Sequence, residues 1–279
     1  MGYEMGGGHY RDILPIGAAL ELMQIATLVI DDILDESYLR NGRESIFAKW
    51  GIKKGILVGE LLKTLSTVSL IHYININKKF RRKNNALMIF ENAYKDICVG
   101  QYLDLLYEEK NIITEEDYLS MIEKTTASFI RASIVIGATL SCTSKNTIKS
   151  LSNYGLHLGI AYQIRDDIID IIGESACTGK PFAGDIRRRK KRLPIIHAFN
   201  TSTPSIKRKL LSIYKKEELD DKDVNDIITI LHENGSIAYS IEKAKKICKD
   251  ADSNIIGLGD EKIRKMLFEL TGLVSTFDL

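Results

Sequence analysis

The stretch AALELMQIATLVIDDILD (18–35) decides the fold class, because it is a long apolar segment that ends in three aspartates. Its apolar residues recur at three- and four-residue spacings, which predicts a helix rather than a strand. The apolar part, 13–30, approaches the length of a membrane span, but it contains Glu21 and Gln24 and leads directly into the aspartates. Charged groups at that position would be costly in a bilayer, so we expect a buried helix and no membrane span.

The rest of the chain repeats this helical spacing. Four further segments carry it, at 57–73, 86–107, 118–140 and 151–172. Thr114 and Asp117 have the spacing of a capping box at the start of the third. No segment shows sustained period-two alternation, and neither a linker nor a repeat of fixed period interrupts the pattern. We therefore predict an all-α fold, a large helical bundle in which residues 1–279 form a single domain.

Composition restricts the function classes. The 279 residues include 39 basic and 37 acidic side chains, which leaves a net charge of +2 and argues against a dedicated nucleic-acid binder. The basic run RRRKKR (187–192) has no interleaved aromatic residues, so it is either a solvated loop or a loop that closes over an anionic substrate. The start, MGYEMGGGHYRD, is unlike a secretory signal, and the four cysteines lack metal-site spacing. A cytoplasmic protein with reduced thiols is expected.

Two short strings carry the chemistry, IDDILD (30–35) and RDDIID (165–170). Residues four apart share a helix face, so Asp31 and Asp35 point the same way. The same holds for Asp166 and Asp170. Like charges at this spacing repel, and the apolar flanks make ionisation harder still. Cations should therefore compensate both strings.

Carboxylate oxygens are the ligands that Mg²⁺ prefers, together with water and substrate phosphate oxygens. The candidate metal ligands are the aspartates of both strings: Asp31, Asp32, Asp35, Asp166, Asp167 and Asp170. One such string alone would suit a solvated helix surface. Two facing copies describe a site for a diphosphate held by several metal ions.

These strings resemble motifs of the trans-type polyprenyl diphosphate synthases, a family that includes geranylgeranyl diphosphate synthase. The resemblance extends over nearly the whole chain and keeps the family's order. It is carried by AALEL (18–22), DDILD (31–35), LRNG (39–42), GQYLD (100–104), YLSMIEKTTASF (118–129), AYQIRDDIID (161–170), GKPFAGD (179–185) and KKRLP (190–194). It implies the isoprenoid synthase type of helical bundle, a cytoplasmic homodimer, and prenyl diphosphates as substrates.

The resemblance also implies a mechanism. The six aspartates would hold three Mg²⁺ ions on the diphosphate of an allylic substrate, and Lys124 would join them in catalysis. The same diphosphate would be bound by Arg40, Lys124, Thr125, Gln163, Lys180 and Lys190. Ionisation of the allylic C–O bond would be followed by attack of the isopentenyl diphosphate double bond and loss of a proton. No protein nucleophile is required.

Product length in this family depends on residues about one turn before the first aspartate. Here these residues are Ala26 and Thr27, both small, and Met23 lies further along the same predicted face. A bulky aromatic residue would stop chain growth, whereas these leave room. We expect a geranylgeranyl (C20) product or a longer one.

The chain departs from the family where isopentenyl diphosphate should bind. GGGHYRD (6–12) matches the turn before the aspartate helix better than it matches the expected Lys-Arg segment. That segment and the first N-terminal helices are therefore expected to be lacking. Gln24 replaces a histidine, and Asn41 replaces an arginine. Three readings stay open: the synthase, a related ionisation enzyme (a terpene cyclase or a transferase to another acceptor), and a non-catalytic prenyl diphosphate-binding subunit.

Overall fold

The computed structural model describes residues 1–173 and 182–277. Helix α1 (Tyr10–Leu34) covers the apolar segment, and the first aspartate string lies at its C-terminal end. The other elements are η1 (Glu4–Gly6), β1 (Leu39–Arg40), β2 (Arg43–Glu44), α2 (Ile46–Ile76), α3 (Lys83–Glu108), α4 (Glu115–Ile122), the π-helical turn η2 (Glu123–Ala127), α5 (Ser128–Leu140), α6 (Lys145–Ile172), α8 (Gly184–Arg187), α9 (Leu193–Thr201), α10 (Pro204–Tyr214), α11 (Asp221–Glu233), α12 (Ser236–Ser253) and α13 (Glu261–Ser275).

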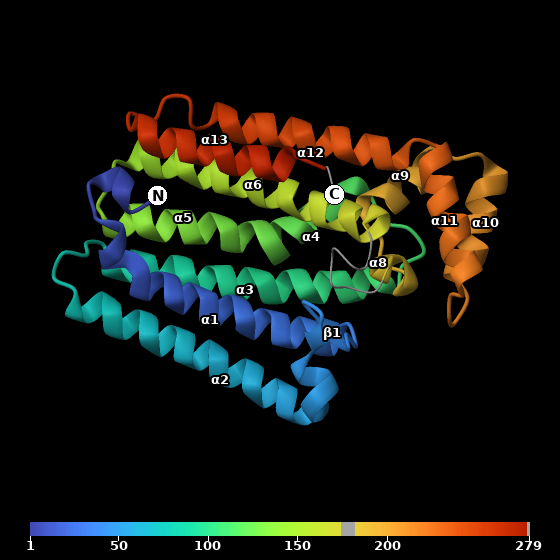
Figure 1. The fold of residues 1–279 in the computed structure, drawn as a ribbon, viewed down its shortest axis with the longest axis horizontal. Helices are drawn as coiled ribbons and strands as arrows, with labels where there is room; N and C mark the ends of the chain where they lie inside the picture. The colour runs from blue at the N-terminus through green and yellow to red at the C-terminus, as the bar shows by residue number, and fades with distance from the viewer. Residues whose placement is uncertain (174–181, 278–279) are drawn as a thin grey trace.

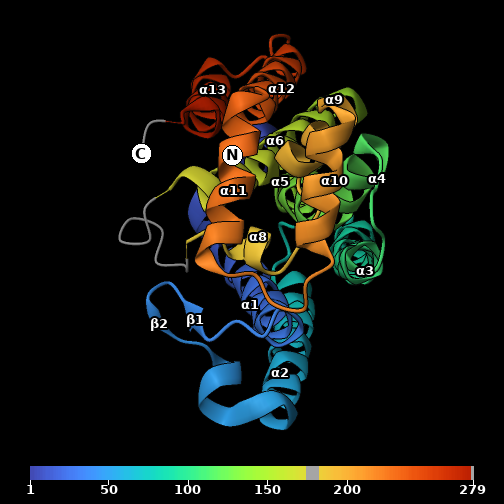
Figure 2. The ribbon, with the colours of Figure 1, turned by 90° about the vertical axis from the view of Figure 1, so that its right-hand side faces the viewer.

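The long helices stack across the molecule (Figure 1). Helix α2 packs along α1, α3 along α5, α5 along α6, and α6 along α12, so the stack extends from α2 on one side to α13 on the other. Helices α10 and α11 cross one end of this stack (Figures 1 and 2). The C-terminal ends of α1, α3 and α6 meet at the same end, beside α8 and the short hairpin.

The helical predictions are confirmed. All four predicted segments lie inside helices, and the capping box is present, with the Asp117 N–H 3.0 Å from Thr114 Oγ1 and the Thr114 N–H 3.0 Å from Asp117 Oδ2. Within residues 1–173 and 182–277, the exception to the all-helical pattern is the β1–β2 hairpin, in which Leu39 pairs with Glu44 and Arg40 with Arg43. Asn41 and Gly42 form its turn with φ of 52° and 72°. Asn-Gly is the preferred pair for a turn in which both residues have positive φ.

Helices α1 and α2 are long and apolar enough to cross a membrane by length and composition alone, which is weak evidence. The inner side of α1 packs into a core that includes Ile16, Ala19 and Met23, together with residues of α2, α3 and α5. Its C-terminal end places Asp32 in the interior with 4% of its surface exposed. Neither helix is a clear membrane span.

Candidate active site

A cavity of about 590 Å³ opens where α1, α3, η2, α6 and α8 meet. Four carboxylates from the two aspartate strings line it, Asp31 and Asp35 from one side and Asp166 and Asp170 from the other. The prediction that residues four apart act on one face therefore agrees with the structure. The middle aspartate of each string, Asp32 or Asp167, is instead buried in the protein.

Arg40 supports the first string. Its Nε donates to Asp32 Oδ1 at 2.9 Å, its Nη2 donates to Asp31 Oδ2 at 2.9 Å, and Nη2 also contacts Asp32. The Asn41–Gly42 turn returns the chain and holds Arg40 in the hairpin over the end of α1. The NH₂ group of Gln101 on α3 donates to Asp31 Oδ1 at 2.8 Å. Arg40 lines the cavity as well, although its hydrogen bonds are to carboxylates.

Neutral donors support the second string. The hydroxyl of Tyr118 donates to Asp167 Oδ2 at 2.6 Å, and Gln163 Nε2 donates to Asp167 Oδ1 at 2.7 Å. Burial raises the pKa of the Asp167 carboxyl to about 7, and the nearby charge of Asp185 adds to this rise. Asp170 accepts a hydrogen bond from the backbone N–H of Asp185 at 2.9 Å. Gln163 also lines the cavity, where Thr126 donates to its Oε1.

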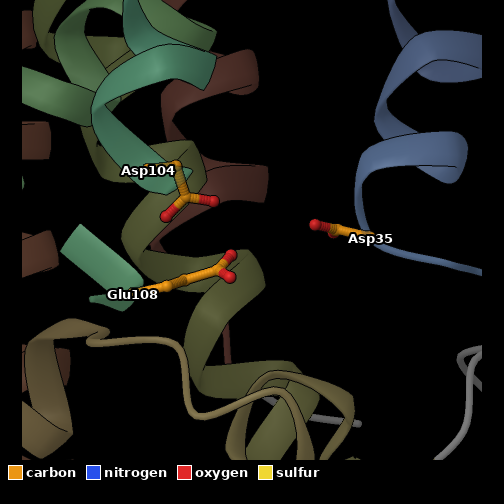
Figure 3. A group of neighbouring side chains, drawn as sticks. All are labelled: Asp35, Asp104 and Glu108. Carbon is orange, nitrogen blue, oxygen red and sulfur yellow. The ribbon is translucent and has the colours of Figure 1, made fainter. Parts of the chain in front are cut away.

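A third acidic group was not anticipated from the sequence. Asp104 and Glu108, one turn apart on α3, face Asp35 across the site (Figure 3), and one oxygen of each lies within 4.8 Å of the others. The ammonium group of Lys190 lies 2.9 Å from Asp35, 2.7 Å from Asp104 and 2.5 Å from Glu108. The i, i+4 spacing of Asp104 and Glu108 is the same signal that singled out the aspartate strings.

The role of Lys190 as a substrate ligand stays a prediction, and in the structure its ammonium group contacts carboxylates. Its side chain is only 2% exposed and it does not line the cavity, because three carboxylates surround its charge. Arg192 lies next to it, with Nη1 2.9 Å from Asp104 Oδ1 and Nε 3.0 Å from Asp185 Oδ2. Burial alone would raise the pKa of Asp185, but the guanidinium groups of Arg192 and Arg188 hold it below its usual range. Lys180 falls outside the described residues.

The π-helical turn η2 carries Lys124 and Thr125, and π-turns inside helices are frequent at functional sites. Thr125 lines the cavity, whereas Lys124 lies beside it, half-buried against α3. Two glycines allow η2 to approach its neighbours. A Cβ at Gly100 would lie 2.6 Å from Thr125 Cγ2, and one at Gly159 would lie 2.4 Å from Ala127 Cα.

The predicted chain-length residues separate in the structure. Thr27 lines the cavity, as do Gln24 and Asn41. Ala26 and Met23 do not: both are buried, and the Ala26 carbonyl faces Gly59 of α2. Their predicted contact with the product stays a prediction, and in the structure both side chains pack inside the helical bundle. An apolar pocket of about 250 Å³ between α1 and α3 shares Thr27, Ile97 and Gln101 with the cavity.

The residues present fit a magnesium site. The four cavity-lining aspartates of the two strings, together with Asp104, which also lines the cavity, offer oxygen atoms only, the donor type that Mg²⁺ prefers. Cationic side chains stand beside them: Arg40 on the first string, Arg188 between Asp35 and Asp185, and Arg192 near the second string. Such a set can bind an anion through both metal ions and guanidinium groups.

Comparisons with known proteins agree with this site. The family model described as polyprenyl synthetase matches residues 2–231. A short chain isoprenyl diphosphate synthase of Methanocaldococcus jannaschii is 34% identical over 82% of this chain and 68% of its own length. A geranylgeranyl diphosphate synthase of Mycobacterium tuberculosis is 32% identical over 98% of this chain and 73% of its own length.

Solved structures agree as well. Geranylgeranyl pyrophosphate synthetase from Pyrococcus horikoshii superimposes with a TM-score of 0.89 at 31% identity, covering 99% of this chain and 83% of that one. Polyprenyl synthase from Caulobacter crescentus, solved with calcium and isoprenyl diphosphate, gives a TM-score of 0.91 at 25% identity, covering 98% and 81%. The chain therefore belongs to the polyprenyl synthetase family and is a prenyltransferase with the all-α isoprenoid synthase fold.

Proposed function

We propose that this enzyme condenses an allylic prenyl diphosphate with isopentenyl diphosphate and releases a product of C20 or longer. The observation that carries the proposal is the single cavity lined by Asp31 and Asp35 from α1 and by Asp166 and Asp170 from α6. Two carboxylate pairs facing one space suit a diphosphate bound through divalent cations. The relatives named as geranylgeranyl diphosphate synthases support the product class.

Asp31, Asp35, Asp166 and Asp170 would hold Mg²⁺, three ions in all, and Asp104, which lines the same cavity, would join them. Bound Mg²⁺ would neutralise the charge that develops on the diphosphate as the allylic C–O bond breaks. The middle aspartates have a different part in this proposal. Asp32 fixes Arg40 and Asp167 fixes Gln163, so that each side chain is held at the cavity wall.

The diphosphate would be bound by Arg40, Thr125 and Gln163 at the cavity wall and by Lys124 beside it. Lys180 belongs to the same proposal on the strength of its motif alone. Lys190 acts one step away, since its ammonium group lies between Asp35 and Asp104 and attracts both carboxylates. Asp104 shows this effect: burial opposes it, but Arg192 and Lys190 lower its pKa.

The prenyl chain would extend from the diphosphate along the apolar part of the cavity. Leu28, Phe129 and Ile130 line this part, and Thr27 joins it to the pocket between α1 and α3. That second pocket is lined almost entirely by apolar atoms, with Ile30, Tyr94 and Cys98 among the contributing residues. Its position supports a long product, because a growing chain could pass Thr27 into it without meeting an aromatic residue at that position.

Helix α2 supports the proposed homodimer. Leu57, Leu61, Leu65 and Val68 form an apolar stripe on its outer side, with Leu57 69% exposed. The helix lies at the edge of the stack and packs chiefly against α1 (Figures 1 and 2). Stripes of this kind on a monomer indicate an interaction surface. We propose that a second copy of this chain covers the stripe, and that the homodimer is located in the cytoplasm. Leu61→Glu should convert the dimer to a monomer, as measured by light scattering after gel filtration.

A second function is favoured by the acceptor side of the cavity. Gln24 and Asn41 line it where the family resemblance leads us to expect a histidine and an arginine. Neutral residues there would bind a second diphosphate weakly. This observation supports an enzyme that ionises the allylic substrate and then cyclises it or transfers it to another acceptor.

One assay tests both functions. The protein is incubated with Mg²⁺, farnesyl diphosphate and labelled isopentenyl diphosphate, and prenyl products and free diphosphate are measured separately. Elongation to C20 or beyond supports the synthase. Release of diphosphate without incorporation of label contradicts it and supports the second function. The matched control is the same incubation with EDTA, in which neither product should form.

A further inference from the structure

From the last residue of α8 onward, every position from 187 to 192 carries a positive charge, and these side chains extend in different directions. Arg188, Lys190 and Arg192 extend toward the aspartates, as their ion pairs with Asp35, Asp104 and Asp185 show. Arg187 and Arg189 bond outward, to Asp221 and to the Lys216 carbonyl. Three cations from one short segment therefore reach a site whose carboxylates come from several helices.

Arg188 differs from the other two inward cations. Lys190 and Arg192 each form ion pairs of 3.0 Å or less with the carboxylates of at least two residues. Arg188 makes one such contact, from Nη2 to Asp185 Oδ1 at 2.8 Å. Its Nε lies 3.7 Å from Asp35 Oδ2 and is buried, with no acceptor within hydrogen-bonding distance in the part of the chain that the structure describes. The side chain lines the cavity and is 32% exposed.

Its place lies between the two aspartate strings. Asp35 ends the first string, and Asp170 ends the second. A Cβ built on Gly184 would lie 3.4 Å from both Arg188 Nη1 and Asp170 Oδ1, so these atoms converge on one point. A guanidinium group has five N–H donors in a planar fork that matches phosphate oxygens. Arg188 thus lines the space in which the diphosphate is expected with a partly exposed guanidinium side chain.

We propose that Arg188 is a further ligand of the substrate diphosphate, and that it balances Asp35 and Asp170 before the diphosphate arrives. The inference rests on the proposed binding of a diphosphate in this cavity. Arg188 and a divalent cation compete for the same carboxylates when no diphosphate is present. Once the anion is bound, both attract it. Removing Arg188 should therefore strengthen the binding of Mg²⁺ alone and weaken the binding of diphosphate.

The test compares Arg188→Gln, Arg188→Lys and the matched control Arg187→Gln, which removes an outward charge one residue away. Isothermal titration calorimetry measures the binding of Mg²⁺ alone and then of inorganic diphosphate in saturating Mg²⁺. For Arg188→Gln we expect diphosphate to bind about 10-fold more weakly or worse, from the loss of charge-assisted hydrogen bonds. Mg²⁺ alone should bind several-fold more tightly, on the order of the effect of one nearby charge.

Arg188→Lys should recover part of the diphosphate affinity, and Arg187→Gln should match the wild type in both titrations. Unchanged diphosphate binding in Arg188→Gln would overturn the inference. The inference would also be overturned if Arg188→Gln bound both Mg²⁺ and diphosphate more weakly and had a lower melting temperature, because that result would indicate a structural role. If the wild type itself fails to bind diphosphate in Mg²⁺, the proposed function fails first.

Discussion

The two aspartate strings have nearly the same sequence pattern but different support. In the first, buried Asp32 is paired with the guanidinium of Arg40, eight residues further along the chain. In the second, buried Asp167 accepts hydrogen bonds from Tyr118, 49 residues away, and from the amide of Gln163. Asp32 is therefore hydrogen-bonded to a cation and Asp167 to neutral donors, although the charge of Arg192, 3.8 Å from Asp167, also lowers the pKa of that carboxyl.

This difference separates two tasks that the pattern combines. The outer aspartates of each string (Asp31 and Asp35, or Asp166 and Asp170) line the cavity. The middle, or inner, aspartate (Asp32 or Asp167) is buried and holds a neighbouring side chain. A buried carboxylate paired with a cation leaves an unpaired charge when it is removed. A carboxylate held by neutral donors leaves only groups that an amide can still partly satisfy. The strings should therefore respond differently to the same substitution.

The largest effect should come from the outer positions, which test what the strings have in common. Asp35→Asn and Asp166→Asn should each lower kcat by about 10³-fold, since each removes a negative ligand that acts on the charge developing in the transition state. The measurement is steady-state turnover in saturating Mg²⁺. The control is Asp12→Asn, a partly exposed position near the start of α1 whose carboxylate pairs with Lys79, and this variant should retain full activity. Activity within tenfold of the wild type in either variant would contradict the assignment.

The inner positions test the difference itself. Asp32→Asn should lower the free energy of unfolding by about 2–3 kcal/mol, because Arg40 loses its main buried partner. Asp167→Asn should cost less than about 1 kcal/mol, since Tyr118 can still donate to the amide oxygen and a desolvated charge is removed. Urea unfolding in EDTA measures both. Equal losses in the two variants would show that the supports are equivalent.

Thr27 and Ala26 test the wall below the first string. Thr27→Phe should shorten the product, because its side chain lines both the cavity and the apolar pocket. Ala26→Phe should instead lower the free energy of unfolding by about 1–3 kcal/mol, because Ala26 is 1% exposed and a larger side chain would overpack its surroundings. Product chromatography and thermal unfolding distinguish the two. A shortened product from Ala26→Phe at unchanged stability would restore the prediction made from the sequence.

The smallest effect concerns pH and the carboxylate beside the second string. The pKa of Asp185 in the folded protein lies below its ordinary value of 3.8, since Arg192 and Arg188 outweigh its burial. The stabilisation is therefore complete above pH 3.8 and is lost as the pH falls through the lowered pKa. Asp185→Asn should be less stable than the wild type at pH 6, and the gap should narrow toward pH 3. Denaturant unfolding at both pH values measures it, and a constant gap would contradict the lowered pKa.

Much of the fold could be predicted from the sequence because its signals are local. Apolar spacing marks the helices, and the Thr114–Asp117 capping box marks the start of one. The short hairpin was overlooked, although Asn41–Gly42 is a strong turn signal. Asn41, where the family resemblance leads us to expect an arginine, thus suits the positive φ of the turn. It also leaves a neutral side chain on the proposed acceptor side of the cavity.

The sequence by itself determined the two aspartate strings, since the i, i+4 spacing of acidic residues needs only helix geometry. Only the tertiary structure decided which aspartate of each string is buried in the protein interior, because that depends on hydrogen bonds from Arg40 and Tyr118, which lie on other elements. It also brought Asp104 and Glu108 to Lys190, and separated Thr27 from Ala26. Helix periodicity defines which residues share a face, but packing against the neighbouring elements determines which face lines the site.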